Sequence, residues 1–157
     1  MPKIEIKTLI ETDLKTCFDL ARDIDFHQKS LEHSKERAIA GKTSGLIELG
    51  ETVTWEAIHF GIRQKLTSKI TEFDYPNYFV DEMLNGAFKS FKHEHIFSKS
   101  YDNKFDKSYT LMVDKFHFES PFGVLGKLAN QLFLTAYMKN LLTLRANLLR
   151  DEAESSG

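Results

Sequence analysis

Residues 124–150 read VLGKLANQLFLTAYMKNLLTLRANLLR, a long run without a proline. Its apolar residues recur at helical spacing and form a broad apolar surface: Leu125, Leu128, Leu132, Leu134, Tyr137, Met138, Leu141, Leu144 and Leu148. This spacing predicts one helix from Val124 to about Arg150. A surface of that width needs a large cover, and the only other large element that the sequence predicts is a β-sheet.

The sheet is predicted from residue 52 to residue 119, where β-branched and aromatic residues alternate with polar ones. The expected strands are 52–60, 63–73, 78–84, 88–97 and 109–119. Asn85-Gly86 is typical of a hairpin turn, and residues 98–108 are predicted to form a polar connection. Connections this short favour an antiparallel meander over parallel units.

The segment before the sheet contains the remaining predicted elements. Alternation over residues 4–8 predicts a half-buried strand. Thr12 or Asp13 can cap a helix that continues to Arg22, and a second short helix is expected over 26–31. Residues 37–40 then form a short strand.

The whole chain has the length of one domain, and no repeat, linker or low-complexity tract divides it. We therefore expect a single domain over residues 1–150, followed by a polar C-terminal tail at 151–157. The single cysteine, Cys17, excludes an internal disulfide and a cysteine-rich metal site. No signal peptide or membrane-spanning run is recognised, which predicts a cytoplasmic protein without integral membrane association.

Charge and aromatic content narrow the function classes. Lys and Arg number 21 against 23 Asp and Glu, for a net charge of -2, so no basic excess is available for binding nucleic acid. The 13 Phe residues carry no polar group, and their number indicates a large apolar interior or an apolar cavity.

Four stretches carry a resemblance to a known family. They are Val53–Ile62 (VTWEAIHFGI), Phe79–Glu82 (FVDE), His93–Phe97 (HEHIF), and Met112–Asp114 (MVD) followed by Pro121–Gly126 (PFGVLG). With the order of elements, they resemble the SRPBCC (START and pollen-allergen-like) superfamily, in its bacterial polyketide cyclase-like or "cell division" protein branch. The resemblance implies an α+β helix-grip fold, in which a curved antiparallel sheet wraps around the long C-terminal helix. Two short helices follow the first strand, and a ligand cavity lies between the sheet and the last helix.

The polar candidates for a site lie on three predicted strands. Residues two apart on a strand share a face, so His93 and His95 point the same way. Asp81 and Asp114 take comparable positions on neighbouring strands. Three interpretations are open: a structural hydrogen-bond network, an anchor for a ligand's polar end, or a metal site. We expect no bound metal.

The apolar walls of the site are predicted at Phe79, Phe91, Met112, Phe116, Leu128 and Leu132. With the polar set they would bind a hydrophobic or amphipathic small molecule, lipid-like or polyketide-like. Two alternatives are an enzyme of cyclase or dehydratase type that uses a His–Asp pair, and a ligand-free regulatory or interaction protein. No cofactor is predicted, because Glu36 stands where the P-loop suggested by Gly41-Lys42-Thr43 needs a glycine. The oligomeric state is not predicted.

Overall fold

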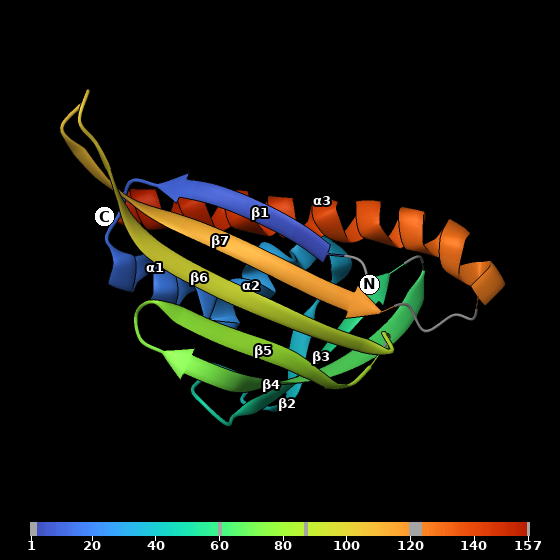
Figure 1. Ribbon diagram of the computed structural model, residues 1–157. Helices are drawn as coiled ribbons and strands as arrows, with labels where there is room; N and C mark the ends of the chain where they lie inside the picture. Colours follow the sequence, from blue (N-terminus) through green and yellow to red (C-terminus); the bar gives the residue numbers. More distant parts are fainter. Residues whose placement is uncertain (1–2, 60, 87, 120–123, 157) are drawn as a thin grey trace.

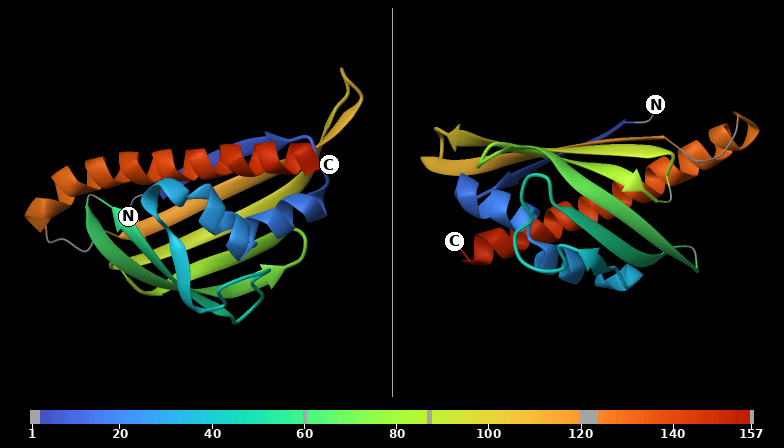
Figure 2. Two further views of the ribbon diagram at one scale, coloured as in Figure 1. Left: turned by 180° about the vertical axis from the view of Figure 1, so that it is seen from behind. Right: turned by 90° about the horizontal axis from the view of Figure 1, so that it is seen from below.

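A curved antiparallel sheet with three helices on one face makes up the described part of the chain (Figures 1 and 2). The computed structural model describes residues 3–59, 61–86, 88–119 and 124–156, without the side chains of residues 124–131 and 156. The elements are β1 (Lys3–Ile10), α1 (Leu14–Ala21), α2 (Ile24–Ser30), the 3₁₀ turn η1 (Glu32–Ser34), β2 (Arg37–Gly41), β3 (Thr52–His59), β4 (Ile62–Asp74), β5 (Tyr78–Asn85), β6 (Ser90–Asp102), β7 (Lys107–Glu119) and α3 (Val124–Ser156). The predicted helix-grip fold is confirmed.

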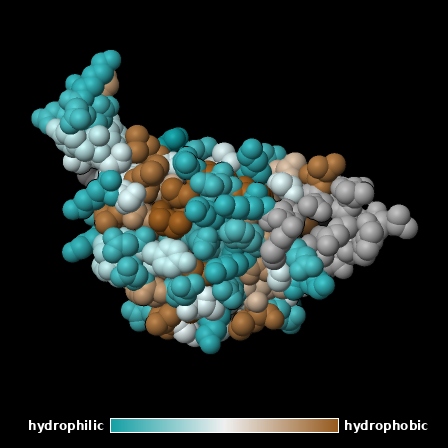
Figure 3. Space-filling model, viewed as in Figure 1, coloured by the Kyte–Doolittle hydropathy of each residue, from teal (hydrophilic) through white to brown (hydrophobic). Residues whose placement is uncertain are grey.

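The seven strands lie in the order β1-β7-β6-β5-β4-β3-β2, with every neighbouring pair antiparallel. Buried and partly exposed residues alternate along β6 and β7, as a sheet with one covered face requires. Hydrophilic side chains cover most of the outer face of the sheet, with smaller apolar patches between them (Figure 3). The functional interior therefore lies on the inner, concave face.

The helices cover that inner face unevenly. α3 packs along β1, α1 and α2, so it follows one edge of the sheet. The first turns of α3 extend beyond the ends of the strands (Figures 1 and 2), and there Leu132 is 77% exposed and Phe133 60% exposed. The expectation that Leu132 faces the interior is wrong, because its side chain lies on the outer side of the helix, whereas Leu134, two residues later, packs against the inner apolar residues.

Two apolar clusters form the core. The larger is centred on Phe18, which packs edge-on against Phe73 and Phe79. The smaller gathers Ile4, Phe91, Phe116 and Phe118 at the other end of the sheet. Phe residues contribute to both clusters, and they make up three of the four buried residues of the smaller one. Residues of both clusters also line the cavity described below.

The short helices begin at aspartates. Asp13 accepts a hydrogen bond from the Thr16 backbone N–H at 3.0 Å and caps α1. Asp23 caps α2 by accepting from the N–H groups of Asp25 and Phe26, so α2 begins two residues before the predicted Phe26. These caps place His27 on the inner side of the fold.

The predicted polar connection at 98–108 is wrong. β6 continues to Asp102 and β7 begins at Lys107, with Ser98 opposite Leu111 and Tyr101 opposite Ser108. The paired backbone groups of the two strands hold this hairpin together, although it projects from the body and buries little (Figure 1).

The predicted tail at 151–157 is helical as far as Ser156, the last residue that the structure describes. Ala146, Leu149 and Ala153 continue the buried stripe of α3, and Ala153 is fully buried. The Thr12 hydroxyl donates to the Ala153 carbonyl at 2.9 Å, and the Glu11 N–H donates to Glu154 Oε2 at 2.9 Å. The segment was predicted to be a polar tail because most of its residues are polar, and a single small apolar residue, Ala153, anchors it.

The break that the sequence predicts at 121–123 lies outside the described residues. Among the helices of the described part, none has the length and hydropathy of a membrane span.

The anchored last turn gives the first test. A chain that ends at Arg150 should lose about 1–3 kcal/mol of unfolding free energy, because Thr12 loses its acceptor and the Ala153 contact disappears. Chemical denaturation measures the loss. The control chain ends at Ser155 and retains both contacts. Equal stability of the two chains would show that the last turn contributes nothing.

Candidate ligand-binding site

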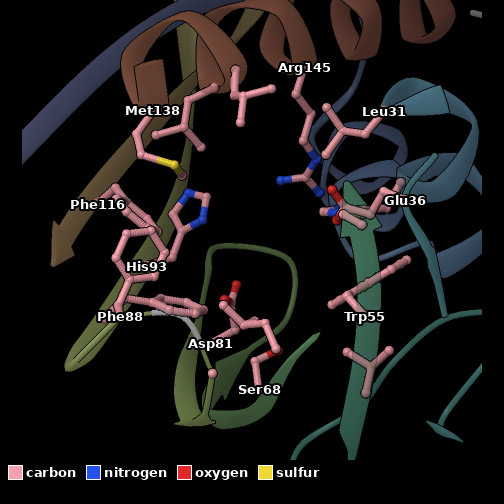
Figure 4. A pocket seen from close by; sticks show the side chains of 18 of the residues that line it. Leu31, Glu36, Trp55, Ser68, Asp81, Phe88, His93, Phe116, Met138 and Arg145 are labelled. Atoms are coloured by element: carbon pink, nitrogen blue, oxygen red, sulfur yellow. The ribbon is translucent and has the colours of Figure 1, made fainter. Parts of the chain in front are cut away.

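A cavity of about 820 Å³ lies between the inner face of the sheet and α3 (Figure 4). Its size falls within the range typical of small-molecule sites. Aromatic and aliphatic side chains form most of the wall, and they include Trp55, Phe79, Phe88, Phe91, Phe116, Met138, Leu141 and Leu142. The uneven cover of α3 leaves this space open over the middle of the sheet.

Two histidine–carboxylate pairs lie side by side in one wall. His95 Nε2 is 2.7 Å from Asp81 Oδ2, and His93 Nε2 is 2.9 Å from Asp114 Oδ1. The two imidazole rings stack with centroids 3.8 Å apart, and Phe79 stacks on the other face of His95 at 4.1 Å. Strand pairing brings the four residues together: His93 is directly opposite Asp81 on β5, and His95 is directly opposite Asp114 on β7. The hydrogen bonds run diagonally, because each histidine bonds the carboxylate that lies opposite the other histidine.

The protonation of these pairs follows from their burial. Burial, and next the neighbouring His93, lower the pKa of His95 to about 4. Burial alone would raise the pKa of Asp81, but the hydrogen bond from His95 and the charge of His93 hold it below its usual value. At neutral pH His95 is therefore an uncharged donor to an ionised Asp81. Its Nδ1 is buried without a hydrogen-bond partner among the described residues, and Asp114 Oδ1 is 3.5 Å away.

The same residues offer a ligand set for a metal ion. Asp81, His93 and His95 each have one ligand atom within 4.8 Å of the others. However, an imidazole binds a metal through a lone pair in the plane of its ring, and stacked rings direct these lone pairs side by side. Both Nε2 atoms are also hydrogen-bonded to carboxylates. The donor geometry therefore fits hydrogen-bonded pairs better than a metal centre.

A second polar group lines the same cavity. His27 on α2 and Glu36 before β2 are joined by a 2.7 Å contact between Nε2 and Oε1, and the His27 ring packs on Trp55 at 4.2 Å. Burial, and next the charge of Arg145, lower the pKa of His27. Burial alone would raise the pKa of Glu36, but the interaction with His27, which includes a hydrogen bond, and the proximity of His59 and Arg145 hold it below its usual value. A hydrogen bond between His59 Nδ1 and the Tyr137 hydroxyl, 2.5 Å long, connects β3 to α3 at the cavity wall.

Arg145 reaches the cavity from α3 (Figure 4). Its Nη2 donates to the Ala21 carbonyl at 2.9 Å, while its buried Nε has no hydrogen-bond partner in the part of the chain that the structure describes. No carboxylate of the described residues lies close enough to it for an ion pair. The guanidinium is thus a charged donor group beside the open space.

Six of the ten predicted site residues line the cavity: Phe79, Asp81, Phe91, His93, His95 and Phe116. Met112 and Asp114 are buried behind that wall and do not line it. Leu132 is exposed, and the side chain of Leu128 lies outside the described residues. The expectation that all ten share one cavity is therefore wrong for Met112, Asp114 and Leu132.

Some of the residues that sequence reasoning missed had a signal. Arg145 interrupts the stripe of Met138, Leu141 and Leu149 on α3, where a charge in an apolar face indicates a special role. His59 has the same strand parity as Trp55 and therefore faces inward. The contact of Glu36 with His27 had no signal, because η1 and the turn at Lys35 set it.

Comparison with known proteins identifies the fold. TTHA0849 from Thermus thermophilus is similar with a TM-score of 0.78 and 14% identity over 99% of both chains. The Zhui aromatase/cyclase from Streptomyces sp. R1128 has a TM-score of 0.74 and 13% identity, over 98% of this chain and 93% of its own. The major latex-like protein 151 of Panax ginseng has a TM-score of 0.66 and 13% identity over 97% of both chains.

No family model matches the chain, and no curated protein matches it. The structural similarity shows that this chain shares the predicted helix-grip fold with these proteins.

The buried His95 generates a pH prediction. Its pKa of about 4 in the folded state lies below the ordinary value of 6.5, so the unfolded chain binds the proton first as the pH falls. Stability should fall by about 1–3 kcal/mol between pH 6.5 and 4. Urea denaturation at a series of pH values measures this slope, which should become shallower in His95→Gln. An identical slope in the variant would mean that His95 does not carry this effect.

The stacked rings generate a metal prediction. Purified protein incubated with excess zinc and then desalted should retain far less than one ion per chain, because the imidazole lone pairs do not converge. Elemental analysis measures the ratio. One ion per chain, lost in His95→Gln, would contradict this interpretation of the pairs.

Proposed function

We propose that this protein binds a hydrophobic or amphipathic small molecule in the cavity between the sheet and α3. The observation that carries the proposal is an 820 Å³ space with largely apolar walls and a few inward polar groups. An interior of this size would be filled in a purely structural domain. For the same reason, the cavity disfavours the alternative of a ligand-free interaction protein.

In this proposal Phe79, Phe91 and Phe116 contact the apolar body of the ligand, and Asp81, His93 and His95 border its polar part. Met112 and Asp114 support that wall from behind. The fold is also that of a protein named as an aromatase/cyclase, so the scaffold is compatible with a small-molecule site. The cytoplasmic location and the absence of nucleic-acid binding stay predictions.

An enzyme is the second candidate, and one observation favours it. His95–Asp81 and His27–Glu36 are two histidine–carboxylate pairs that border one cavity. A histidine held by a carboxylate is a common general acid or base. In the enzyme, His95→Gln would abolish turnover of a bound molecule, whereas in a carrier it would change only affinity.

A cavity-filling variant tests the binding proposal. Ala57 is buried on β3 and lines the cavity, so Ala57→Phe should place its ring in the ligand's space. The neutral dye N-phenyl-1-naphthylamine should bind wild-type protein with micromolar affinity, about 8 kcal/mol, and bind Ala57→Phe at least ~10-fold more weakly. Dye fluorescence measures both constants.

The matched control is Leu132→Trp, which enlarges an exposed residue outside the cavity and should leave dye binding unchanged. Thermal melts establish that both variants fold. Undiminished binding in folded Ala57→Phe would contradict the proposed cavity. Native mass spectrometry of freshly purified protein then searches for a co-purified small molecule.

A further inference from the structure

The wall that α2, β2 and α3 share holds a donor and an acceptor that do not bind each other. Arg145 and Glu36 point toward the same corner of the cavity from α3 and from the start of β2 (Figure 4). Each makes one hydrogen bond elsewhere, Arg145 to the Ala21 carbonyl and Glu36 to His27. No ion pair joins the two charged groups in the described part of the chain, and both border the same cavity, so both are available to a small polar group there.

This corner of the cavity has both donors and acceptors that are free to form hydrogen bonds. The guanidinium has five N–H donors, and only one of them has a protein acceptor among the described residues. The Glu36 side chain is only 12% exposed, and its second oxygen makes no hydrogen bond within the described part of the chain. A group that accepts from Arg145 and donates to Glu36 satisfies both residues.

The charges in the wall limit what that group can be. Glu36 and Asp81 both border the cavity as carboxylates, whereas Arg145 has no ion-pair partner among the described residues. The other charged residues of the wall are engaged or exposed: Arg22 Nε is bound to Asp19 at 3.0 Å, Asp23 caps α2, and Lys65 is exposed. A carboxylate on the ligand would add a negative charge beside Glu36 and Asp81, whose side chains are largely buried, and there such repulsion is weakly screened.

We propose that Arg145 and Glu36 bind the polar end of the ligand, and that this end is an uncharged group such as a hydroxyl or carboxamide, which both accepts and donates a hydrogen bond. The inference rests on the proposed function and names the ligand's chemical class. Phe88, Phe116 and Met138 lie on the opposite side of the cavity (Figure 4) and receive the apolar body. The ligand class is a neutral amphiphile and not a fatty acid.

A matched series of probes tests this class. Dodecanamide, dodecanol and dodecanoate share one chain length and differ only at the polar end. In displacement of N-phenyl-1-naphthylamine at pH 7.5, the amide and the alcohol should bind about 10-fold more tightly than the carboxylate, as expected for one hydrogen bond to a charged group. Equal affinities, or tightest binding of dodecanoate, would overturn the proposal.

Two variants test the residues. Glu36→Gln removes the negative charge, so dodecanoate should gain affinity and the difference from dodecanamide should shrink by about 10-fold. Arg145→Gln should weaken the amide and the alcohol by a similar factor. The control is Lys139→Gln, which removes an exposed cation from the same helix and should change none of these values.

The outcomes distinguish a failure of the proposed function from a failure of the inference about the ligand's polar end. If the dye does not bind wild-type protein, or if folded Ala57→Phe binds it equally well, the proposed function itself fails. If the dye binds in the cavity but Glu36→Gln leaves the preference among the three probes unchanged, this inference alone fails. Glu36→Gln provides the test even if Arg145→Gln does not fold.

Discussion

The position of α3 along one edge of the sheet is the constraint on which the rest of the structure depends. A single helix is too narrow to cover the concave face of seven strands, and α3 packs against β1, α1 and α2. The inner faces of β3 to β6 are therefore left to surround open space. The cavity is the geometric result of one helix on a wide, curved sheet, and its polar groups border the space that no helix fills.

Buried polar groups in such an interior need partners, and the structure supplies most of them locally. Neighbouring strands place His95 against Asp81 and His93 against Asp114, so each ring meets a carboxylate without a long loop. Pairing of this kind offsets the cost of removing charge from water. Among the described residues, three buried side-chain atoms have no hydrogen-bond partner: Thr71 Oγ1, His95 Nδ1 and Arg145 Nε. His95 and Arg145 border the cavity, where the proposed ligand would alter the local polarity.

Local periodicity predicted the parts of the site that lie on single strands. The period of two was enough to place His93, His95 and Phe91 on the inner face, because strand pairing keeps that parity over the whole sheet. Helical periodicity was less informative for Leu132. The apolar residues of α3 are spread around much of the helix, and their spacing alone did not show that Leu134 lies on the inner side and Leu132 on the outer side.

The second polar group could not be predicted from the sequence. His27 and Glu36 are nine residues apart, whereas Arg145 is near the other end of the chain, and no local pattern relates the three. Their meeting depends on where α2 and η1 lie against α3. Similarly, the mostly polar residues of 151–157 gave no indication that Ala153 is buried, because its partner Thr12 is near the other end of the chain.

The pairing of β1 with β7 affects how the chain reaches this structure. Lys3 lies opposite His117, about 110 residues later in the chain, and α3 follows β7. During synthesis, β1 therefore stays unpaired, with Ile4 and Ile10 exposed to solvent, until almost the whole chain has left the ribosome. Contacts between such distant segments make folding slow. Charged residues alternate with the apolar ones on β1: Lys3, Glu5 and Lys7. Their charges disfavour pairing of the unpaired strand with other chains.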